Sequence, residues 1–383
     1  MIRPVHGGNL AWAAALAGCP ASAILDFSAS ISPLGPPESA LAAIQAHLSS
    51  LTAYPDPDYG ELRTALGEAL NVDRDWILPG NGSAELLTWA AWDLSKLEAT
   101  YVVTPAFGDY SRALLAFGAQ VLECPLELQS LDAEAGSRLE TDDLSVSNRS
   151  LVSPSLCLPV PLAIDAHRQG LLLNNPHNPT GLLFGREAIL PYVKQLGMVV
   201  VDEAFMDFLP PSERETLIDA VEEFPNLVIL RSLTKFYSLP GLRLGCAIAH
   251  PDILRRWQLQ RDPWPVNALA AAAAAAVVRD TVFERQTWDW LPVARRELFE
   301  GLANLPGLQP IAGAANFLLV ESSMSVSSIQ KSLLERHRIL IRDCLSFPEL
   351  GDRFFRVAVR SRADNLQLIA GLSEVIRQLT VDC

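Results

Sequence analysis

The sequence predicts an α/β protein with a mostly parallel central sheet and helices on both of its faces. Two observations lead to this prediction. Short apolar runs alternate with helical stretches, and each run ends in a polar or glycine-rich loop; the runs lie at 76–78, 101–103, 171–173, 199–201 and 227–230. This alternation is typical of buried parallel strands joined by helices. Because such sheets bind ligands at the carboxyl ends of their strands, we expect the functional site in these loops.

The length of the chain predicts more than one folding unit. At 383 residues it exceeds the usual size of a single hydrophobic core, and 49% of its residues are apolar, which is enough for two. We expect an N-terminal arm, a large domain and a small α+β domain, with bounds at 1–35, 36–275 and 276–383. The small domain is predicted from two apolar runs, 316–320 and 354–359, and from the helices around them.

The remaining elements follow from periodicity and from proline. Helical periodicity predicts helices over 10–16, 38–48, 61–70, 84–92, 279–305 and 364–379. The proline cluster after Ile31 forbids a helix in the extended piece 24–37, whose Leu25 and Phe27 we expect to pack against the small domain. The alanine-rich run 269–278 predicts a buried helix in close contact with its neighbours. Residues 122–166 are rich in proline and serine with little periodicity, so we interpret them as an excursion outside the pattern.

Composition and charge argue against several classes of function. The formal net charge is −14 and no block of lysine and arginine occurs, so we expect no nucleic-acid-binding surface. No run reaches the roughly 20 apolar residues that span a bilayer, and the N-terminus lacks the apolar core of a signal peptide. The six cysteines are scattered, without the close pairs of a metal or redox site. We therefore expect a reduced cytoplasmic protein without a metal, whose few cations gather around any anionic ligand.

Lys235 is the candidate for covalent chemistry. It follows the apolar run 227–230, with the hydroxyl residues Ser232 and Thr234 close before it. A lysine amine has a pKa of about 10.4, so it reacts readily with an aldehyde at neutral pH only if burial or a neighbouring cation lowers that pKa. Arg243 is a candidate for that cation and for binding an anion, and the two hydroxyls suit a phosphate. An isolated lysine in a loop is more often a solvated surface charge, so the assignment depends on the residues around it.

Pyridoxal phosphate requires several further groups, and the sequence has a candidate for each. Asp202, directly after the run 199–201, is placed to pair with a protonated ring nitrogen, although an acidic residue can also simply end a strand. Asn178 lies in the turn Asn178–Gly181 and has an amide for the ring oxygen. Phe107 has a ring that can stack on the cofactor, although a phenylalanine after a strand is more often part of the core.

The stretch Gly80–Ser83 precedes the helix expected over 84–92 and is the candidate phosphate site. A glycine turn that opens a helix leaves backbone N–H groups, here those of Gly82, Ser83 and Ala84, at the positive end of the helix dipole. Ser83 is explained equally well as a helix N-cap.

Together, these motifs in this order and spacing resemble those of the fold-type I aminotransferases over nearly the whole chain. The motifs are Gly80–Ser83, Asn178–Gly181, Asp202–Ala204, Ser232–Lys235 and Arg243. Within that superfamily, three further stretches resemble the threonine-phosphate decarboxylases of cobalamin biosynthesis, which are close relatives of histidinol-phosphate aminotransferases. These stretches are His6–Asn9, Leu25–Gly35 and Ile339–Cys344.

The resemblance implies a fold-type I fold, pyridoxal 5'-phosphate as the cofactor, and a role for each candidate. Lys235 would bind the cofactor covalently and Asp202 would pair with its ring nitrogen. Asn178 would donate to the ring oxygen and Phe107 would stack on the ring. The residues implied for the cofactor phosphate are Gly82, Ser83, Ala84, Ser232, Thr234 and Arg243. Tyr54 would complete the phosphate site of the neighbouring subunit in a homodimer.

The resemblance also implies a small phosphorylated amino acid as the substrate. The residues implied for its pocket are His6, Ser32, Asn178, Arg342 and Arg356. Arg356 matches the arginine that binds the substrate carboxylate, and Arg342 and His6 match groups near the substrate phosphate. The alternative for Arg342 is a surface arginine paired with Asp343.

Two residues depart from the family pattern. Phe205 replaces the tyrosine that many aminotransferases have after Asp-Glu-Ala, so one donor to the ring oxygen is missing, a change that is familiar in the decarboxylase group. Ser32 replaces an asparagine that the pattern has before Pro33.

The implied reaction is decarboxylation of L-threonine O-3-phosphate to (R)-1-aminopropan-2-ol O-2-phosphate. The bond at Cα that lies perpendicular to the cofactor ring breaks fastest. Decarboxylation and transamination differ in whether the carboxylate or the hydrogen takes that position, which the sequence does not report, so histidinol-phosphate-type transamination is the alternative. A third interpretation, a non-catalytic ligand-sensing domain of a transcription regulator, requires a basic helix-turn-helix, and neither terminus has one.

Overall fold

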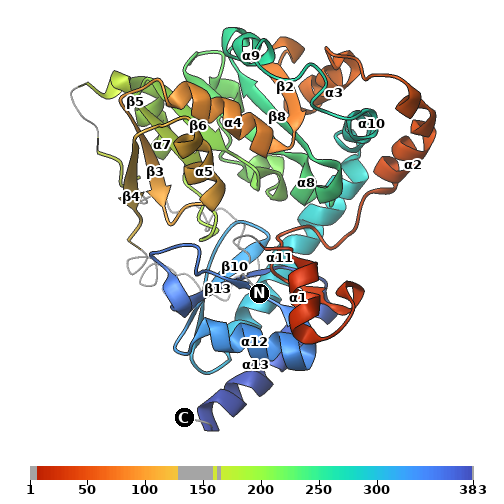
Figure 1. Ribbon diagram of the computed structural model, residues 1–383, viewed down its shortest axis with the longest axis vertical. Helices are drawn as coiled ribbons and strands as arrows, with labels where there is room; N and C mark the ends of the chain where they lie inside the picture. Colours follow the sequence, from red (N-terminus) through yellow and green to blue (C-terminus); the bar gives the residue numbers. More distant parts are fainter. Residues whose placement is uncertain (1–6, 128–157, 162–164, 382–383) are drawn as a thin grey trace.

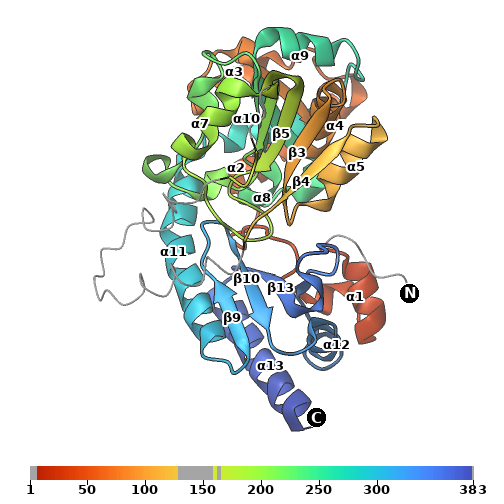
Figure 2. The same ribbon diagram turned by 90° about the vertical axis from the view of Figure 1, so that its left-hand side faces the viewer.

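The computed structural model describes residues 7–127, 158–161 and 165–381. Figure 1 shows a larger α/β unit above a smaller unit, and the smaller unit contains both α1 (Leu10–Ala17) and α13 (Arg362–Val381). The long helix α11 (Thr281–Ala303) extends from one unit to the other in both Figure 1 and Figure 2.

The larger unit is built on a seven-stranded sheet with the order β2-β8-β7-β6-β5-β3-β4. In chain order the strands are β2 (Ile77–Asn81), β3 (Ala99–Thr104), β4 (Val121–Pro125), β5 (Gln169–Asn174), β6 (Met198–Asp202), β7 (Leu227–Ser232) and β8 (Leu244–Ala249). Strand β8 is antiparallel to both of its neighbours, and the other neighbouring pairs are parallel. The other strands therefore all end at one edge of the sheet, and β8 begins at that edge.

Helices cover both faces of this sheet, because successive residues of each strand point to opposite sides. Val199 and Val201 of β6 belong to a core shared with α3 (Gly60–Leu70), α7 (Arg186–Gln195) and α10 (Ala268–Val277). Val200 belongs to a core shared with α4 (Ser83–Leu94), α5 (Gly108–Ala116) and α9 (Pro251–Gln258). Figure 2 shows α7 and α10 on one side of the sheet and α4 and α5 on the other. The prediction of a mostly parallel sheet with helices on both faces is confirmed.

The smaller unit has a four-stranded antiparallel sheet with the order β12-β13-β10-β9. Its elements are β9 (Leu308–Ile311), β10 (Phe317–Ser322), α12 (Val326–His337), β12 (Arg342–Asp343) and β13 (Phe354–Ala358). The N-terminal segment joins this unit, because β1 (Leu25–Asp26) pairs in parallel with β11 (Ile339–Leu340) and α1 packs against α12. The bounds that we gave for the arm and the two domains stay predictions.

The predicted helices are present with ends shifted by a few residues. The helix expected over 38–48 is α2 (Glu38–Ala46), which a 3-10 turn at Leu48–Thr52 follows. The alanine-rich run forms α10, which packs against α2 and α3 as expected for a helix with small side chains. The stretches expected over 61–70, 84–92, 279–305 and 364–379 correspond to α3, α4, α11 and α13.

One expectation about the strands was wrong, and one strand was not predicted. The stretch 122–166 is not wholly outside the sheet pattern, since β4 pairs in parallel with β3; it is an edge strand with partly exposed side chains, so it lacks a continuous apolar run. The rest of that interpretation concerns mainly 128–157 and 162–164, which lie outside the described residues. Strand β8 was not expected at all, because its sequence of small residues, Leu-Gly-Cys-Ala-Ile-Ala, shows no strand periodicity.

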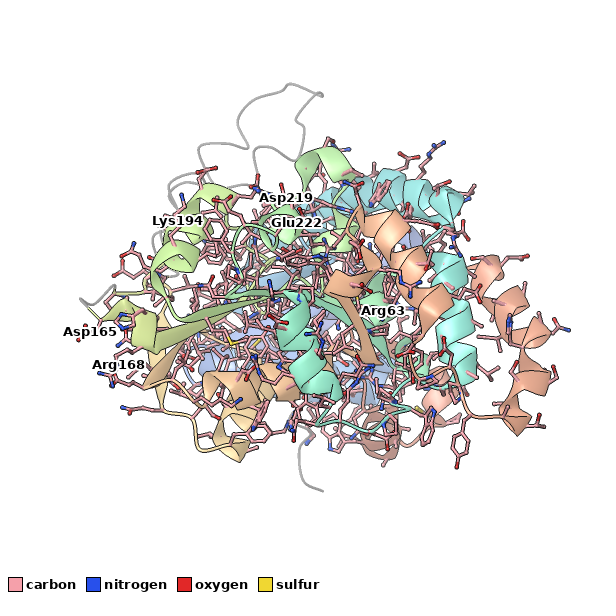
Figure 3. All side chains as sticks on the ribbon, turned by 90° about the horizontal axis from the view of Figure 1, so that it is seen from above. Arg63, Asp165, Arg168, Lys194, Asp219 and Glu222 are labelled. Carbon is pink, nitrogen blue, oxygen red and sulfur yellow. The ribbon has the colours of Figure 1, made fainter. Side chains whose placement is uncertain are left out.

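Exposed charged residues lie on the face of the larger unit that is turned away from the smaller one. Figure 3 shows this face from above and labels the exposed residues Lys194, Asp219 and Glu222. In the part of the chain that the structure describes, no helix is long and apolar enough to cross a membrane.

Candidate active site

The site lies at the sheet edge where β2, β3, β5, β6 and β7 end. Lys235 is in the short helix α8 (Leu233–Phe236), directly after β7, and its Nζ donates a hydrogen bond to Ser232 Oγ at 2.9 Å. Burial lowers the pKa of the Lys235 amine, and the charges of Arg243 and Arg356 lower it further, while Asp202 acts in the opposite direction. Burial and neighbouring cations are the two causes that make a lysine amine reactive at neutral pH.

Asp202 ends β6 and receives a donor on each carboxylate oxygen. The hydroxyl of Tyr110 donates to Oδ2 at 2.8 Å, and the backbone N–H of Ala204 donates to Oδ1 at 3.0 Å. Burial raises the pKa of Asp202, and Lys235 together with these two donors counteracts the effect of burial. Tyr110 was not predicted from the sequence. Its spacing from Phe107 was the available signal, since residues three apart share one face of a helix.

The candidate phosphate site is the turn between β2 and α4. Gly82 has φ +77°, which favours glycine, and a Cβ atom built on it would lie 2.6 Å from Arg243 Nη2. A Cβ atom on Gly245 would lie 2.5 Å from the backbone nitrogen of Ser83. Arg243 comes directly before β8, so the reversed direction of β8 brings its guanidinium to the N-terminus of α4. Two glycines without side chains therefore leave room for a cation beside the N–H groups of a helix start.

Hydroxyl groups lie at the same edge. Ser232 is the last residue of β7, and Thr234 lies in α8 next to Lys235. The two hydroxyl oxygens, Ser232 Oγ and Thr234 Oγ1, are 2.9 Å apart. Arg243 is exposed, and its Nη1 donates to the carbonyl of Pro240 at 3.2 Å. A dianion in this turn would meet the Arg243 guanidinium, the helix dipole and hydroxyl donors, which is the chemistry of a phosphate site.

Asn178 connects the loop after β5 with the smaller unit. Its backbone N–H donates to Asn174 Oδ1 at 2.7 Å, and its Oδ1 accepts a hydrogen bond from Arg356 Nη1. Because Oδ1 faces Arg356, the amide nitrogen of Asn178 points away from that arginine and is oriented as a donor. The residue implied for the ring oxygen and the residue implied for the substrate carboxylate are therefore in direct contact.

Arg356 lies in β13 and is almost completely buried. Its guanidinium packs on the ring of Phe317 at 4.8 Å from the ring centre, and Nη2 donates to the carbonyl of Ser28 at 3.3 Å. Burial lowers its pKa to about 10, and the charge of Arg342 contributes to the lowering. Among the described residues, its Nε has no hydrogen-bond partner. A buried cation in this state favours an anionic ligand.

Arg342 lies in β12, directly opposite Arg356 in the sheet register. Its Nη2 donates to Ser346 Oγ at 2.6 Å, and its Nη1 lies 3.8 Å from Asp343 Oδ1. The alternative for Arg342 was a surface arginine paired with Asp343. The contact with Asp343 is present, but Arg342 is only 7% exposed, so it is not a surface residue. The reason is that β12 packs inside the smaller unit, between β13 and α12.

A small cavity lies beside Arg342 under the N-terminal arm. Its lining includes Gly7, Gly8, Asn9, Ser28 and Gln330. The backbone N–H of Gly8 donates to Ser28 Oγ at 2.7 Å, so the arm is held against this cavity. His6, the other residue implied for the substrate phosphate, lies outside the described residues.

Two further residues that were singled out in the sequence lie near Lys235. Ser32 is tied to the Lys235 loop by its backbone, because its N–H donates to the Lys235 carbonyl at 3.0 Å and its carbonyl accepts from Ser238 Oγ at 2.7 Å. Phe205 packs edge-on against Phe317, and Lys235 Nζ lies 5.6 Å from the centre of the Phe205 ring.

Tyr54 is 78% exposed, and its ring stacks on Trp264 with 4.4 Å between the ring centres. Within one chain its contact is therefore Trp264 rather than the group around Lys235. Among the residues that the structure describes, no group of three or more His, Cys, Asp or Glu side chains could hold a metal ion.

The residues gathered at this edge fit a molecule with an aldehyde, a basic ring nitrogen and a phosphate. Lys235 is an amine whose pKa is lowered, Asp202 is a carboxylate with a donor on each oxygen, and the turn at Gly82 suits a dianion. Arg342 and Arg356 of the smaller unit can bind further anionic groups nearby. This donor set matches the requirements of pyridoxal phosphate.

Comparison with known proteins gives the same result over the full length. Residues 22–372 match the family described as aminotransferase class I and II. The chain is 38% identical over 382 residues to threonine-phosphate decarboxylase of Salmonella typhimurium. This match covers 98% of each of the two chains. It is 32% identical to a putative threonine-phosphate decarboxylase of Caldanaerobacter subterraneus, over 89% of this chain and 88% of that protein.

The fold is also shared with a solved structure of histidinol-phosphate aminotransferase from Sinorhizobium meliloti, in complex with pyridoxal-5'-phosphate. The TM-score is 0.78 at 23% identity, and the match covers 97% of this chain and 95% of the other. With the family match, the full-length relatives and the arrangement of Lys235, Asp202 and Asn178 in agreement, the chain belongs to the aminotransferase class I and II family.

Proposed function

We propose that the protein is a pyridoxal-phosphate-dependent lyase that decarboxylates L-threonine O-3-phosphate to (R)-1-aminopropan-2-ol O-2-phosphate in cobalamin biosynthesis. The observation that carries the proposal is the pair of buried arginines, Arg342 and Arg356, on neighbouring strands beside Asn178. Two buried cations suit a substrate with two separate anions. The similarity to threonine-phosphate decarboxylases over the full length supports the same choice.

In this proposal the larger unit binds the cofactor. Lys235 attaches it covalently, Asp202 pairs with the ring nitrogen, and Phe107 stacks on the ring. Asn178 donates to the ring oxygen, held in that orientation by Arg356. The residues that hold the phosphate are Gly82, Ser83, Ala84, Ser232, Thr234 and Arg243. When bound, pyridoxal phosphate accepts the electron pair of the bond that breaks at the substrate Cα.

The smaller unit and the arm bind the substrate. Arg356 grips the carboxylate, and Arg342 binds the phosphate together with His6 and the segment next to it. Ser32 fixes the arm to the Lys235 loop through its backbone. Two anchored anions orient the substrate between them, so the carboxylate is held in one position relative to the ring. Lys235 Nζ is the group available to move a proton at Cα.

The absence of a tyrosine hydroxyl at Phe205 favours the same reaction. The Phe205 and Phe317 rings form an apolar wall between Lys235 and Arg356. Phenylalanine at this position is familiar in the decarboxylase group, so Phe205 supports decarboxylation over transamination.

The test compares the two reactions that the fold can support. Purified holoprotein is incubated with O-phosphothreonine, and separately with histidinol phosphate and 2-oxoglutarate, and carbon dioxide and glutamate are measured. The proposal requires carbon dioxide from the first mixture and little glutamate from the second, and Lys235→Ala should produce neither. Rapid glutamate formation without carbon dioxide would make the protein an aminotransferase.

We further propose a cytoplasmic homodimer in which Tyr54 reaches the phosphate site of the partner. The proposal is supported by several exposed apolar side chains close to Tyr54 in the sequence, namely Leu34, Leu41, Leu48 and Leu51. Exposed apolar patches of this kind often mark protein interfaces. The free thiols of Cys19, Cys124, Cys246 and Cys344 agree with a reducing compartment.

A further inference from the structure

Tyr110 is a buried tyrosine whose hydroxyl contacts the acid of the site. It lies in α5, it is 2% exposed, and its hydroxyl donates to Asp202 Oδ2 at 2.8 Å. The donor comes from the first turns of the helix after β3, and the acceptor ends β6. The contact therefore joins two elements that are separated by 92 positions in the sequence.

The hydrogen bonds of Asp202 leave its carboxylate little freedom to rotate. Tyr110 occupies one oxygen and the N–H of Ala204 occupies the other. The backbone carbonyl of Asp202 is held as well, since it accepts from Asn174 Nδ2 at 2.6 Å and from the N–H of Asn175 at 2.9 Å. Rotation of the carboxylate would break at least one of these buried hydrogen bonds, and an unpaired buried polar group costs free energy.

Tyr110 also belongs to the same helix face as Phe107. Their rings meet edge-on at 5.7 Å between centres. Phe107 is the N-cap residue of α5, so the start of this helix places the ring implied for stacking on the cofactor and, one turn later, the hydroxyl that holds the acid implied for its ring nitrogen. One rigid element fixes two contacts to one ring.

The acceptor of the Tyr110 hydroxyl differs from that of the buried Tyr59, whose hydroxyl donates to the backbone carbonyl of Val266 at 3.0 Å. Tyr110 instead donates to a buried carboxylate, and a hydrogen bond to a charged acceptor is stronger than one to a neutral group. Its removal would act first on the state of Asp202 rather than on the packing.

We infer that Tyr110 is a positioning residue whose hydroxyl keeps the Asp202 carboxylate ionised and oriented toward the ring nitrogen of the cofactor. The inference rests on the proposed function, because it requires pyridoxal phosphate to bind with its ring at Asp202. It concerns cofactor affinity directly and the rate of the reaction through Asp202.

Tyr110→Phe tests the inference, because it removes one oxygen atom and keeps the ring. The dissociation constant of pyridoxal phosphate is measured by titration of the apoprotein, and the visible absorbance of the holoprotein is recorded. We expect the dissociation constant to rise about tenfold, which corresponds to the loss of one charge-assisted hydrogen bond. The visible band should shift, since the ring nitrogen faces a weaker anion.

Tyr101→Phe is the matched control. The Tyr101 hydroxyl is also buried in the larger unit, but it donates to Gln169 Oε1 at 3.0 Å, where Gln169 begins β5 at the opposite edge of the sheet. We expect this variant to keep the cofactor affinity and the spectrum of the original protein. An equal loss in both variants would show a general effect of removing a buried hydroxyl and would overturn the inference.

A double-mutant cycle with Asp202→Asn separates positioning from packing. In the Asp202→Asn background the carboxylate is gone, so Tyr110→Phe should change the cofactor affinity little. The same loss in both backgrounds, or an unchanged dissociation constant in Tyr110→Phe alone, would contradict the inference. Because no substrate is present, a shifted dissociation constant supports the role of Tyr110 even if O-phosphothreonine proves not to be the substrate.

Discussion

The site contains buried cationic side chains, although the chain as a whole is strongly acidic. The protein has a formal net charge of −14, yet Arg342 and Arg356 are buried on neighbouring strands and Lys235 lies close enough to Arg356 for its charge to affect the lysine pKa. Like charges that are gathered in a buried place destabilise one another and lose solvation. Bound anions would relieve this destabilisation, so these residues indicate an anionic ligand.

Lys235 should carry the cofactor through a bond to its Nζ. We predict that the purified protein absorbs in the visible range, and that borohydride reduction removes this band and adds the mass of the reduced cofactor to the peptide that contains Lys235. The reason is the lowered pKa, which increases the fraction of neutral amine near pH 7. Lys235→Ala should lose both signals. A variant that still fixed the cofactor on borohydride treatment would place the attachment elsewhere.

Arg342 should discriminate phosphorylated from unphosphorylated substrates. Arg342→Ala should raise KM for O-phosphothreonine on the order of 100-fold, because loss of one partner of a desolvated charge pair commonly costs about 2–5 kcal/mol. Turnover of free threonine, measured in parallel, should change little. The control is Arg353→Ala, whose side chain is 60% exposed and pairs with Glu321 at the surface. A similar loss on both substrates would mean that Arg342 has a structural role.

Among the elements, the reversed strand β8 has the largest consequence for the site. Sequence patterns identified the loops after β2, β3, β5, β6 and β7, because apolar runs end there. They did not identify β8, whose small residues resemble a loop, and so they gave Arg243 no position in the sheet. Pairing of β8 with β2 and β7 is a long-range feature that places Arg243 beside Gly82. Local periodicity does not contain this information.

The turn between β2 and α4 should not tolerate a side chain at position 82. Gly82→Ala is expected to weaken cofactor binding at least tenfold, because its Cβ would displace the Arg243 guanidinium and N–H groups from the phosphate site. Gly118→Ala is the matched control, since Gly118 also has a positive φ of +71° but nothing within 4 Å of the added atom. Both variants share the backbone strain. If their dissociation constants for pyridoxal phosphate were equally affected, contact with Arg243 would not be the cause.

The loop after β5 should make stability depend on pH through His177. This side chain is 1% exposed, and burial lowers its pKa from 6.5 to about 4. Between these values the unfolded chain binds a proton at this residue that the folded protein does not, so the free energy of unfolding rises with pH across the window. Across the whole window the free energy of unfolding changes by about 3 kcal/mol.

His177→Gln should reduce this dependence. Urea unfolding at pH 7 and at pH 5 measures the difference in the free energy of unfolding, which should be smaller in the variant than in the original protein. Thr180→Ala removes the partner of His177 Nδ1, at 2.8 Å, and retains the imidazole, so it should keep most of the dependence. If the free energy of unfolding differed between pH 7 and pH 5 by the same amount in His177→Gln and in the original protein, His177 would not be the cause of the pH dependence.

At the scale of the whole molecule, the sequence predicted the fold and most of the residues that meet at the sheet edge. Lys235, Asp202, Asn178 and Arg356 follow strands or lie in them, and the structure brings them together. Tyr110 was missed, because a tyrosine in an amphipathic helix has the same local pattern whether it faces the core or a carboxylate. Its partner is fixed only when β3 and β6 take their places in the sheet.

The proposed homodimer can be tested by mixing two defective proteins. Tyr54→Ala should impair the partner's phosphate site, and Lys235→Ala should inactivate its own site. After mild unfolding and joint refolding, mixed dimers contain one site in which both residues are intact, so we expect activity to reappear. Mixing of the two proteins without subunit exchange is the control. No recovery in dimers that are shown to be mixed would assign Tyr54 to its own subunit or to no site.

The central claim is that the site breaks the bond between Cα and the carboxylate of a phosphorylated amino acid. The most direct measurement is NMR of the products when holoprotein converts O-phosphothreonine in D2O, with 2-oxoglutarate present as an amino-group acceptor. Decarboxylation predicts 1-aminopropan-2-ol phosphate that keeps the original Cα hydrogen and gains one deuterium at the same carbon. A 2-oxo acid that has lost the Cα hydrogen and kept its carboxylate would contradict the claim and identify transamination as the reaction.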